Sequence, residues 1–266
     1  MNLLFLGDIA ASSGRTALAK HLPLLREKYA LDCVIANGEN SHSTSRGITE
    51  DTAQEIFRAG VDVITLGDHT FDQKGVEVLL AQNQRIIRPA NYPQGTVGRG
   101  HTVFTTASGK RVGVINLQGR VFINQQTDCP FQKAKALMDE LRLGDTVDAL
   151  VVDIHAEATS EKCLMGYVWD GKASLVVGTH THIPTNDARI QPKGTAYQSD
   201  AGMCGDYNSS LGMSFESVLP HMLQRGRFKF EPASGEGTLC GVLVTVGANG
   251  LATHVQSIKV GGVLGE

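Results

Sequence analysis

The chain has 266 residues, of which 41% are hydrophobic and 19% charged, so it is long and apolar enough to bury a sizeable core. Its 24 basic and 27 acidic side chains give a formal net charge of −3, which excludes the basic surface typical of a DNA-binding module. The 30 glycines and 8 prolines argue against a helical bundle, and no Gly- or Pro-rich tract predicts a linker. We therefore expect a single turn-rich domain spanning residues 1–266.

The N-terminus and the cysteines indicate where the protein resides. The apolar run Leu3 to Leu6 is short and no basic segment precedes it, so it does not predict a signal peptide. No run of about 18 apolar residues predicts a membrane-spanning helix. The five cysteines are far apart and form no C-x-x-C pair, which argues against a disulfide framework and against a structural zinc site. These features predict a soluble, cytoplasmic protein.

The first part of the chain alternates β-type apolar runs with helical patterns. We expect strands at Leu3 to Leu6, Cys33 to Ala36 and Val61 to Leu66. A loop at Ala11 to Gly14 is expected to lead into a helix that ends by Ala30. A second helix is expected to begin after the capping residue Thr49 and to stop at Gly60. This βαβαβ order predicts a sheet wound by crossover helices.

The later elements continue the alternation. Strands are expected at Arg111 to Asn116, Ala149 to Ile154, Ser174 to Val177 and Thr195 to Gln198, and helices around Phe131 to Leu143 and Phe215 to Leu223. From Leu239 to Val260, apolar and polar residues alternate around a turn at Gly247 to Gly250, which predicts an antiparallel hairpin closing one edge of the fold. A Rossmann dinucleotide site is excluded, because the first turn offers only Gly7 and Gly14.

Polar side chains able to bind a metal follow, or end, five of the apolar strands. These residues are Asp8, Glu39 with Asn40, Asp68 with His69, His155, and His180 with His182. In a mainly parallel sheet the carboxyl ends of the strands lie along one edge, so we expect these side chains to converge on one crevice. A single strand-terminal Asp is more often a turn residue or a helix cap, but five such endings together indicate a site.

The ligand types define the chemistry of this crevice. Carboxylates together with imidazoles suit Mn, Fe, Zn or Co, whereas an all-oxygen set would suit Mg or Ca. More than four candidate ligands argue for two metal ions, which a carboxylate such as Glu39 can bridge. Two such ions are the usual machinery of phosphoester hydrolysis.

The blocks that carry these residues resemble those of the calcineurin-like metallophosphoesterases, and more narrowly of their YmdB-type bacterial branch. They are Gly7-Asp8, Gly38-Glu39-Asn40, Gly67-Asp68-His69, Asp153 to Lys162, and Gly178 to His182. Further blocks similar to that branch are Arg88 to Pro93, Asn116 to Arg120 and Lys193 to Tyr197, so the resemblance runs the whole length. It implies an α/β sandwich of two β-sheets flanked by helices, with metals at the sheet edge, usually iron or manganese.

The resemblance also implies individual roles. It places Asp8, Glu39, Asn40 and His182 at one metal ion, and Glu39, Asp68, His155 and His180 at the other. His69 falls where the family has a histidine that donates a proton or contacts the phosphate. Many members of the superfamily carry Asn where this chain has Asp68, and the extra carboxylate lowers the net positive charge of a two-metal site. Its effect on catalysis stays open.

Other polar residues allow two interpretations. Asp153 and Glu157 either orient His155 and its neighbours or serve in capping and solvation. His42 lies two residues beyond Asn40 and is a further candidate for substrate contact, which we weigh against a surface role. Ser160 has no G-x-S-x-G context, so a metal site explains His155 better than nucleophilic catalysis does.

The sequence thus predicts a dinuclear metal-dependent phosphodiesterase acting on small phosphoesters, such as the 2′,3′-cyclic nucleotides that the resemblance implies. Two alternatives remain: a weakly catalytic metal- or nucleotide-binding regulatory protein, and a 5′-nucleotidase or phosphomonoesterase. The expected partners are a small phosphoester and two transition-metal ions, iron or manganese, with no membrane and no DNA. The physiological substrate, homo-oligomerisation and any regulatory partner stay open.

Overall fold

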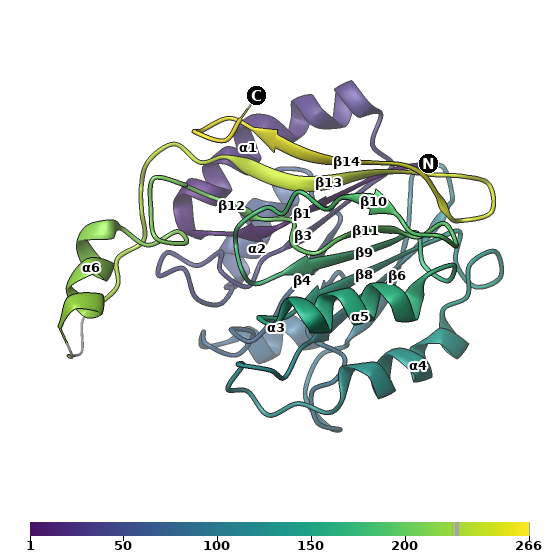
Figure 1. Cartoon of the computed structure of the whole chain (residues 1–266), viewed down its shortest axis with the longest axis horizontal. Helices are drawn as coiled ribbons and strands as arrows, with labels where there is room; N and C mark the ends of the chain where they lie inside the picture. The colour runs from purple at the N-terminus through teal and green to yellow at the C-terminus, as the bar shows by residue number, and fades with distance from the viewer. Residues whose placement is uncertain (225, 227–228, 266) are drawn as a thin grey trace.

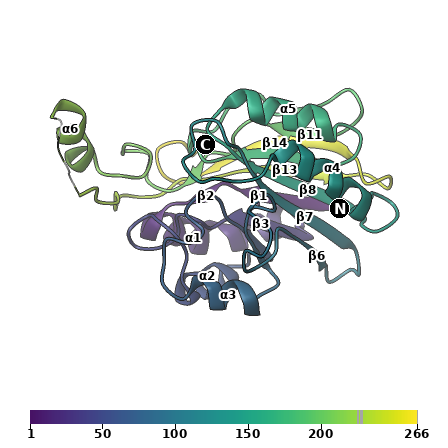
Figure 2. The ribbon, with the colours of Figure 1, turned by 90° about the horizontal axis from the view of Figure 1, so that it is seen from below.

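Two β-sheets packed face to face form the middle of the molecule, with helices on both outer faces (Figure 1, Figure 2). The computed structural model describes residues 1–224, 226 and 229–265. Figure 2 shows the layers from the side, with α1, α2 and α3 on one face and α4 and α5 on the other. This is the expected α/β sandwich of two sheets flanked by helices, and the fold prediction is confirmed.

The first sheet has six strands, most of them from the N-terminal half of the chain. In spatial order they are β14 (Ala252–Val260), β13 (Leu239–Val246), β1 (Asn2–Leu6), β3 (Cys33–Asn37), β4 (Val63–Thr65) and β5 (Ile86–Ile87). Strands β1, β3, β4 and β5 run parallel, while β13 pairs antiparallel with both β1 and β14. The predicted C-terminal hairpin is therefore confirmed, and it closes one edge of this sheet.

The second sheet also has six strands. In spatial order they are β10 (Arg189–Ile190), β11 (Ala196–Gln198), β9 (Leu175–Thr179), β8 (Ala149–His155), β7 (Arg111–Gln118) and β6 (His101–Thr105). The four central strands run parallel, and the two edge strands pair antiparallel with their neighbours. A separate short pair joins β2 (Asp8–Ile9) to β12 (Met203–Cys204).

Six helices complete the described part of the chain. They are α1 (Ala11–Tyr29), α2 (Glu50–Arg58), α3 (Val76–Gln82), α4 (Pro130–Glu140), α5 (Thr159–Trp169) and α6 (Phe215–Leu223). The predicted start of α2 is confirmed, because the Thr49 and Thr52 hydroxyls form a reciprocal capping box. The predicted loop at Ala11 to Gly14 is wrong: these residues are the first turn of α1, and the Ser13 hydroxyl donates to the carbonyl of Ala10 inside that turn.

Alternating side chains divide the interior into three apolar layers. Leu4 and Leu6 of β1 pack with α1, α2 and α3, whereas Leu3 and Phe5 of the same strand face the other sheet. The second sheet packs its outer face against α4 and α5, where Trp169 is fully buried. Burying each large apolar side chain stabilises the fold by about 1.5–3 kcal/mol.

The sequence predicts that five strand ends lie at the edge of one sheet, but these strands belong to two different sheets. Strands β1, β3 and β4 lie in the first sheet, and β8 and β9 lie in the second. Because the sheets pack face to face, residues that follow these strands still meet, but across the sandwich. The sequence pattern identifies the strands without assigning them to sheets, since pairing partners such as β1 and β13 are far apart along the chain.

Helix α6 stands apart from the sandwich at the end of an extended segment (Figure 1, Figure 2). Its bounds agree with the prediction of Phe215 to Leu223. Within the described residues, no helix combines the length and the apolar composition that a membrane crossing requires.

Candidate metal centre

Three carboxylates come from the first sheet. Asp8 begins β2, directly after the turn that ends β1, while Glu39 and Asp68 lie two and three residues beyond β3 and β4. Asp8 and Glu39 are fully buried, which is rare for carboxylates that have no compensating charge.

Three imidazoles come from the second sheet. His155 is the last residue of β8, and His180 follows β9 directly. His180 and His182 both have left-handed backbones, with φ of 93° and 65°. The strand has therefore already ended at these residues, and both imidazoles reach the site from the loop that follows β9. Such strained backbone at non-glycine residues is typical of functional sites.

Four of the predicted residues form a tight cluster. One ligand atom from each of Glu39, Asp68, His155 and His180 lies within 4.8 Å of the others. His155 Nε2 lies 3.1 Å from Glu39 Oε1 and 3.0 Å from Asp68 Oδ1, and His180 Nδ1 lies 3.2 Å from the same Asp68 oxygen. This is the set that the resemblance places at one ion.

A second group lies beside this cluster and shares Glu39 with it. Asn40 Nδ2 lies 3.3 Å from Glu39 Oε1 and 3.2 Å from His182 Nε2, which in turn lies 3.7 Å from Asp8 Oδ1. Turning the Asn40 amide by 180° would exchange Nδ2 for Oδ1, the atom able to bind a cation. All seven predicted ligand residues are thus brought together.

The residues present fit a pair of cations. Asp8 Oδ1 is buried and, in the described part of the chain, has no hydrogen-bond partner. A buried carboxylate oxygen without a hydrogen bond costs free energy unless a cation binds to it. Nor is there room for a side chain at Gly67, whose added Cβ would lie 2.4 Å from both Glu39 Oε2 and His155 Nε2. The backbone is packed this closely against the cluster only because residue 67 is glycine.

The pKa shifts within the cluster also show that its carboxylates favour a positive charge beside them. Burial alone would lower the pKa of His155, but the adjacent carboxylates of Glu39 and Asp68 hold it well above its usual value. Burial alone would raise the pKa of Asp68, but the hydrogen bonds with His155 and His180 hold it below its usual range. Mixed carboxylate and imidazole donors suit transition metals better than Mg or Ca.

Asp153 lies beneath His155 and positions it through Thr179. The Thr179 hydroxyl lies 2.9 Å from His155 Nδ1 and donates to Asp153 Oδ1 at 2.7 Å. The other Asp153 oxygen accepts from Thr65 at 2.5 Å, and burial raises the pKa of Asp153 to about 7. Of the two interpretations of Asp153, the contacts favour the one in which it orients His155.

Asp153→Ala is expected to lower the free energy of unfolding of the metal-free protein by roughly 2–4 kcal/mol. The substitution leaves the buried groups of Thr65, Thr179 and Asn37 without their shared acceptor. Urea denaturation checks this, with Asp153→Asn as the control that keeps one acceptor oxygen. A loss below about 1 kcal/mol would contradict a structural role for this carboxylate.

His69 lies at the rim of the cluster. Its backbone N–H donates to Glu39 Oε2 at 3.0 Å, and its Nδ1 lies 2.9 Å from Asp72 Oδ2. The Nε2 atom lies 3.8 Å from the carboxylate of Asp68. Because Asp72 engages Nδ1, Nε2 is the nitrogen left to face a substrate.

Two hollows flank the cluster. One, of about 290 Å³, is lined on its apolar side by Leu211 and Met213, and the other, of about 350 Å³, is lined by Asp68, Phe122 and Asn124. Arg46, His69 and His180 line both hollows.

Several residues of this site were not predicted as site residues, among them Arg46, Phe122 and Glu157. Arg46 and Phe122 lie on loops, where no periodic pattern indicates their position. Glu157 was left open, and its Oε2 lies 3.1 Å from His180 Nε2, so it orients that imidazole. His42 instead pairs with Thr44 at 2.9 Å and lines neither hollow.

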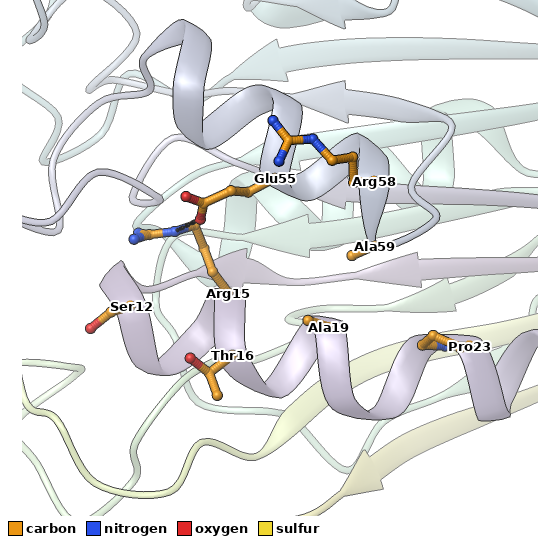
Figure 3. A pocket seen from close by; sticks show the side chains of 8 residues that line it. All are labelled: Ser12, Arg15, Thr16, Ala19, Pro23, Glu55, Arg58 and Ala59. Atoms are coloured by element: carbon orange, nitrogen blue, oxygen red, sulfur yellow. Dashed lines mark hydrogen bonds and ion pairs between the residues drawn. The ribbon is translucent and has the colours of Figure 1, made fainter.

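A further hollow, of about 460 Å³, lies between α1 and α2 (Figure 3). Its carboxylate, Glu55, is already paired with Arg15 at 2.6 Å. The Arg15 guanidinium also donates to the carbonyl of Ser41, so it braces the turn after Asn40. None of the seven candidate ligands lines this hollow, so it is separate from the metal centre.

A sandwich of two sheets flanked by helices, with carboxylates and imidazoles meeting where the strands end, is the architecture of the metallophosphoesterases. A family model described as "YmdB-like protein" matches residues 4–258. The chain belongs to this YmdB-like family.

Individual relatives agree with this assignment. A Bacillus subtilis (strain 168) protein named 2′,3′-cyclic-nucleotide 2′-phosphodiesterase is 42% identical over 246 residues, covering 92% of this chain and 91% of that protein. A crystal structure of a hypothetical protein from Thermus thermophilus superposes with a TM-score of 0.91 at 37% identity, covering 99% and 100% of the two chains. A crystal structure of a novel phosphatase from Mycoplasma pneumoniae superposes with a TM-score of 0.90 at 32% identity, covering 98% of this chain and 93% of that chain.

Proposed function

We propose that this protein is a metal-dependent phosphodiesterase that hydrolyses small phosphoesters such as 2′,3′-cyclic nucleotides. The observation that carries the proposal is the cluster of Glu39, Asp68, His155 and His180, in which Glu39 and His155 are buried. Beside it, within the described residues, lies an Asp8 oxygen that has no hydrogen-bond partner. The name of the Bacillus subtilis relative supports the substrate class.

The proposed cations are two transition-metal ions, iron or manganese. One is held by Glu39, Asp68, His155 and His180, the other by Asp8, Glu39, Asn40 and His182. When bound, such ions supply positive charge and Lewis acidity at the phosphoryl group. Glu39 belongs to both sets, because it contacts His155 of the first and Asn40 of the second.

The protein's own groups complete the chemistry. His69 Nε2, with Nδ1 engaged by Asp72, is placed to give a proton to the departing ester oxygen. Arg46 lines both hollows beside the cluster, so its guanidinium can attract the phosphate there. Because Asp8 and His155 are fully buried, we expect the phosphoester to approach from the hollows that His69 and His180 line.

The proposal is tested by metal analysis of the purified protein together with turnover of bis-p-nitrophenyl phosphate, 2′,3′-cAMP and 3′-AMP. We expect both diesters to be hydrolysed, turnover to be lost on chelation, and iron or manganese to restore it. Metal binding without turnover of any of the three would favour a regulatory protein. Faster turnover of 3′-AMP than of either diester would favour a phosphomonoesterase.

A further inference from the structure

Phe122 is an exposed aromatic residue held in a strained conformation. Its side chain is 85% exposed, and its backbone is left-handed with φ of 63°. Exposing a large apolar ring and holding a non-glycine residue in this region both cost free energy, and such features concentrate where a ligand binds.

Its loop is fixed on both sides of the ring. On one side, the carboxylate of Glu161 accepts from the backbone N–H groups of Arg120, at 3.0 and 3.2 Å, and of Val121, at 3.2 Å. On the other side, Gln125 Nε2 donates to the backbone carbonyl of Asp68 at 3.0 Å. The backbone of Phe122 is therefore tied to the turn that presents Asp68 to the cluster, which keeps the residue beside the metal centre.

The space between them suits a planar, polar-edged group. Phe122 lines the hollow of about 350 Å³ together with Asp68, His69 and Asn124, and this volume lies in the range of small-molecule sites. An aromatic ring offers stacking to any nucleobase, and the Asn124 amide offers both a donor and an acceptor to its edge. The opposite hollow has aliphatic and thioether side chains, Leu211 and Met213, and no phenylalanine, tyrosine or tryptophan among its described lining residues.

We propose that Phe122 and Asn124 form a nucleobase subsite, in which the base of a nucleoside phosphoester stacks on the ring while its phosphodiester lies at Asp68 and His69. This inference rests on the proposed phosphodiesterase function and deepens it. It makes the protein selective for nucleoside substrates over phosphodiesters that lack a base. Because stacking is tolerant of base identity, the selectivity is for the presence of a base.

The test compares two cyclic phosphodiesters, 2′,3′-cAMP and glycerol 1,2-cyclic phosphate, which lacks a base. We expect the ratio of their kcat/KM values to fall about 5- to 150-fold in Phe122→Ala, the range of base stacking on an aromatic ring. The ratio should hold within about two-fold in Phe122→Trp, which keeps a stacking face, and in Val121→Ala, whose side chain lines neither hollow. An unchanged ratio in Phe122→Ala would overturn the subsite, whether neither kcat/KM value falls or both fall by the same factor.

A binding measurement separates the subsite from the proposed function. If the wild type hydrolyses neither substrate, the phosphodiesterase proposal fails, but calorimetric titration still decides the subsite. We then expect Phe122→Ala to weaken binding of 3′-AMP to the metal-loaded protein by a similar factor and to leave the affinity for inorganic phosphate within about two-fold. Equal affinity of wild type and Phe122→Ala for 3′-AMP would overturn the subsite and favour a protein partner for the exposed ring.

Discussion

Glu39→Ala is expected to remove both metal ions and to lower turnover of 2′,3′-cAMP by about 10³-fold or more, because Lewis-acid activation contributes several kcal/mol to such reactions. Asp8→Ala is expected to keep about one ion per chain. The difference arises because Glu39 contacts residues of both ligand sets, whereas Asp8 contacts only His182 and the backbone N–H of His180 among the described ligand residues. Metal content per chain is the measurement.

A matched variant separates loss of metal from loss of fold. Glu39→Gln keeps an acceptor for the His69 N–H, so it should leave the metal-free protein folded while still failing to hold two ions. Circular dichroism of the chelated proteins checks the fold. If Glu39→Ala retained both ions while Asp8→Ala lost both, the bridging role of Glu39 would be wrong.

His69→Ala is expected to keep both metals and to lower kcat for 2′,3′-cAMP by about 10²–10⁴-fold, the usual contribution of a general acid. The ribose oxygen leaves poorly and needs a proton, whereas p-nitrophenolate leaves unaided. Turnover of bis-p-nitrophenyl phosphate should therefore fall much less. Steady-state kinetics on both substrates, with metal content measured on the same preparations, is the check.

Asp72 offers the control for this assignment. Asp72→Asn keeps a hydrogen-bond acceptor beside His69 Nδ1 but removes the charge, so its effect should follow the same substrate order with a smaller loss. Equal losses on both substrates in His69→Ala would show instead that His69 contributes electrostatic binding of the phosphoryl group.

The sequence predicts those features that depend on local pattern. The buried strands β1, β3 and β8 have near-continuous apolar runs, and α2 carries its cap at Thr49 in the sequence itself. The ligand residues are predictable for the same reason, because each follows or ends such a strand. A polar residue at that position is conspicuous, whereas the same residue in a loop is not.

What the sequence does not predict depends on contacts between distant segments. Helix α5 is absent from the expected helices, since it buries Glu161 and Lys162, two charged residues that local periodicity would place on a solvent-exposed face. Lys162 pairs with Asp200 at 2.8 Å, and Glu161 holds the Phe122 loop. These partners lie on other elements, so neither the helix nor the position of Phe122 follows from local periodicity.

The most direct test of the dinuclear centre is anomalous X-ray diffraction from crystals of the protein, recorded on both sides of the iron and manganese absorption edges. We expect two peaks, one among Glu39, Asp68, His155 and His180 and the other among Asp8, Glu39, Asn40 and His182. Both peaks should contact the Glu39 carboxylate. A single peak, or peaks that leave Glu39 uncontacted in protein shown to be fully loaded with metal, would contradict a dinuclear centre bridged by Glu39.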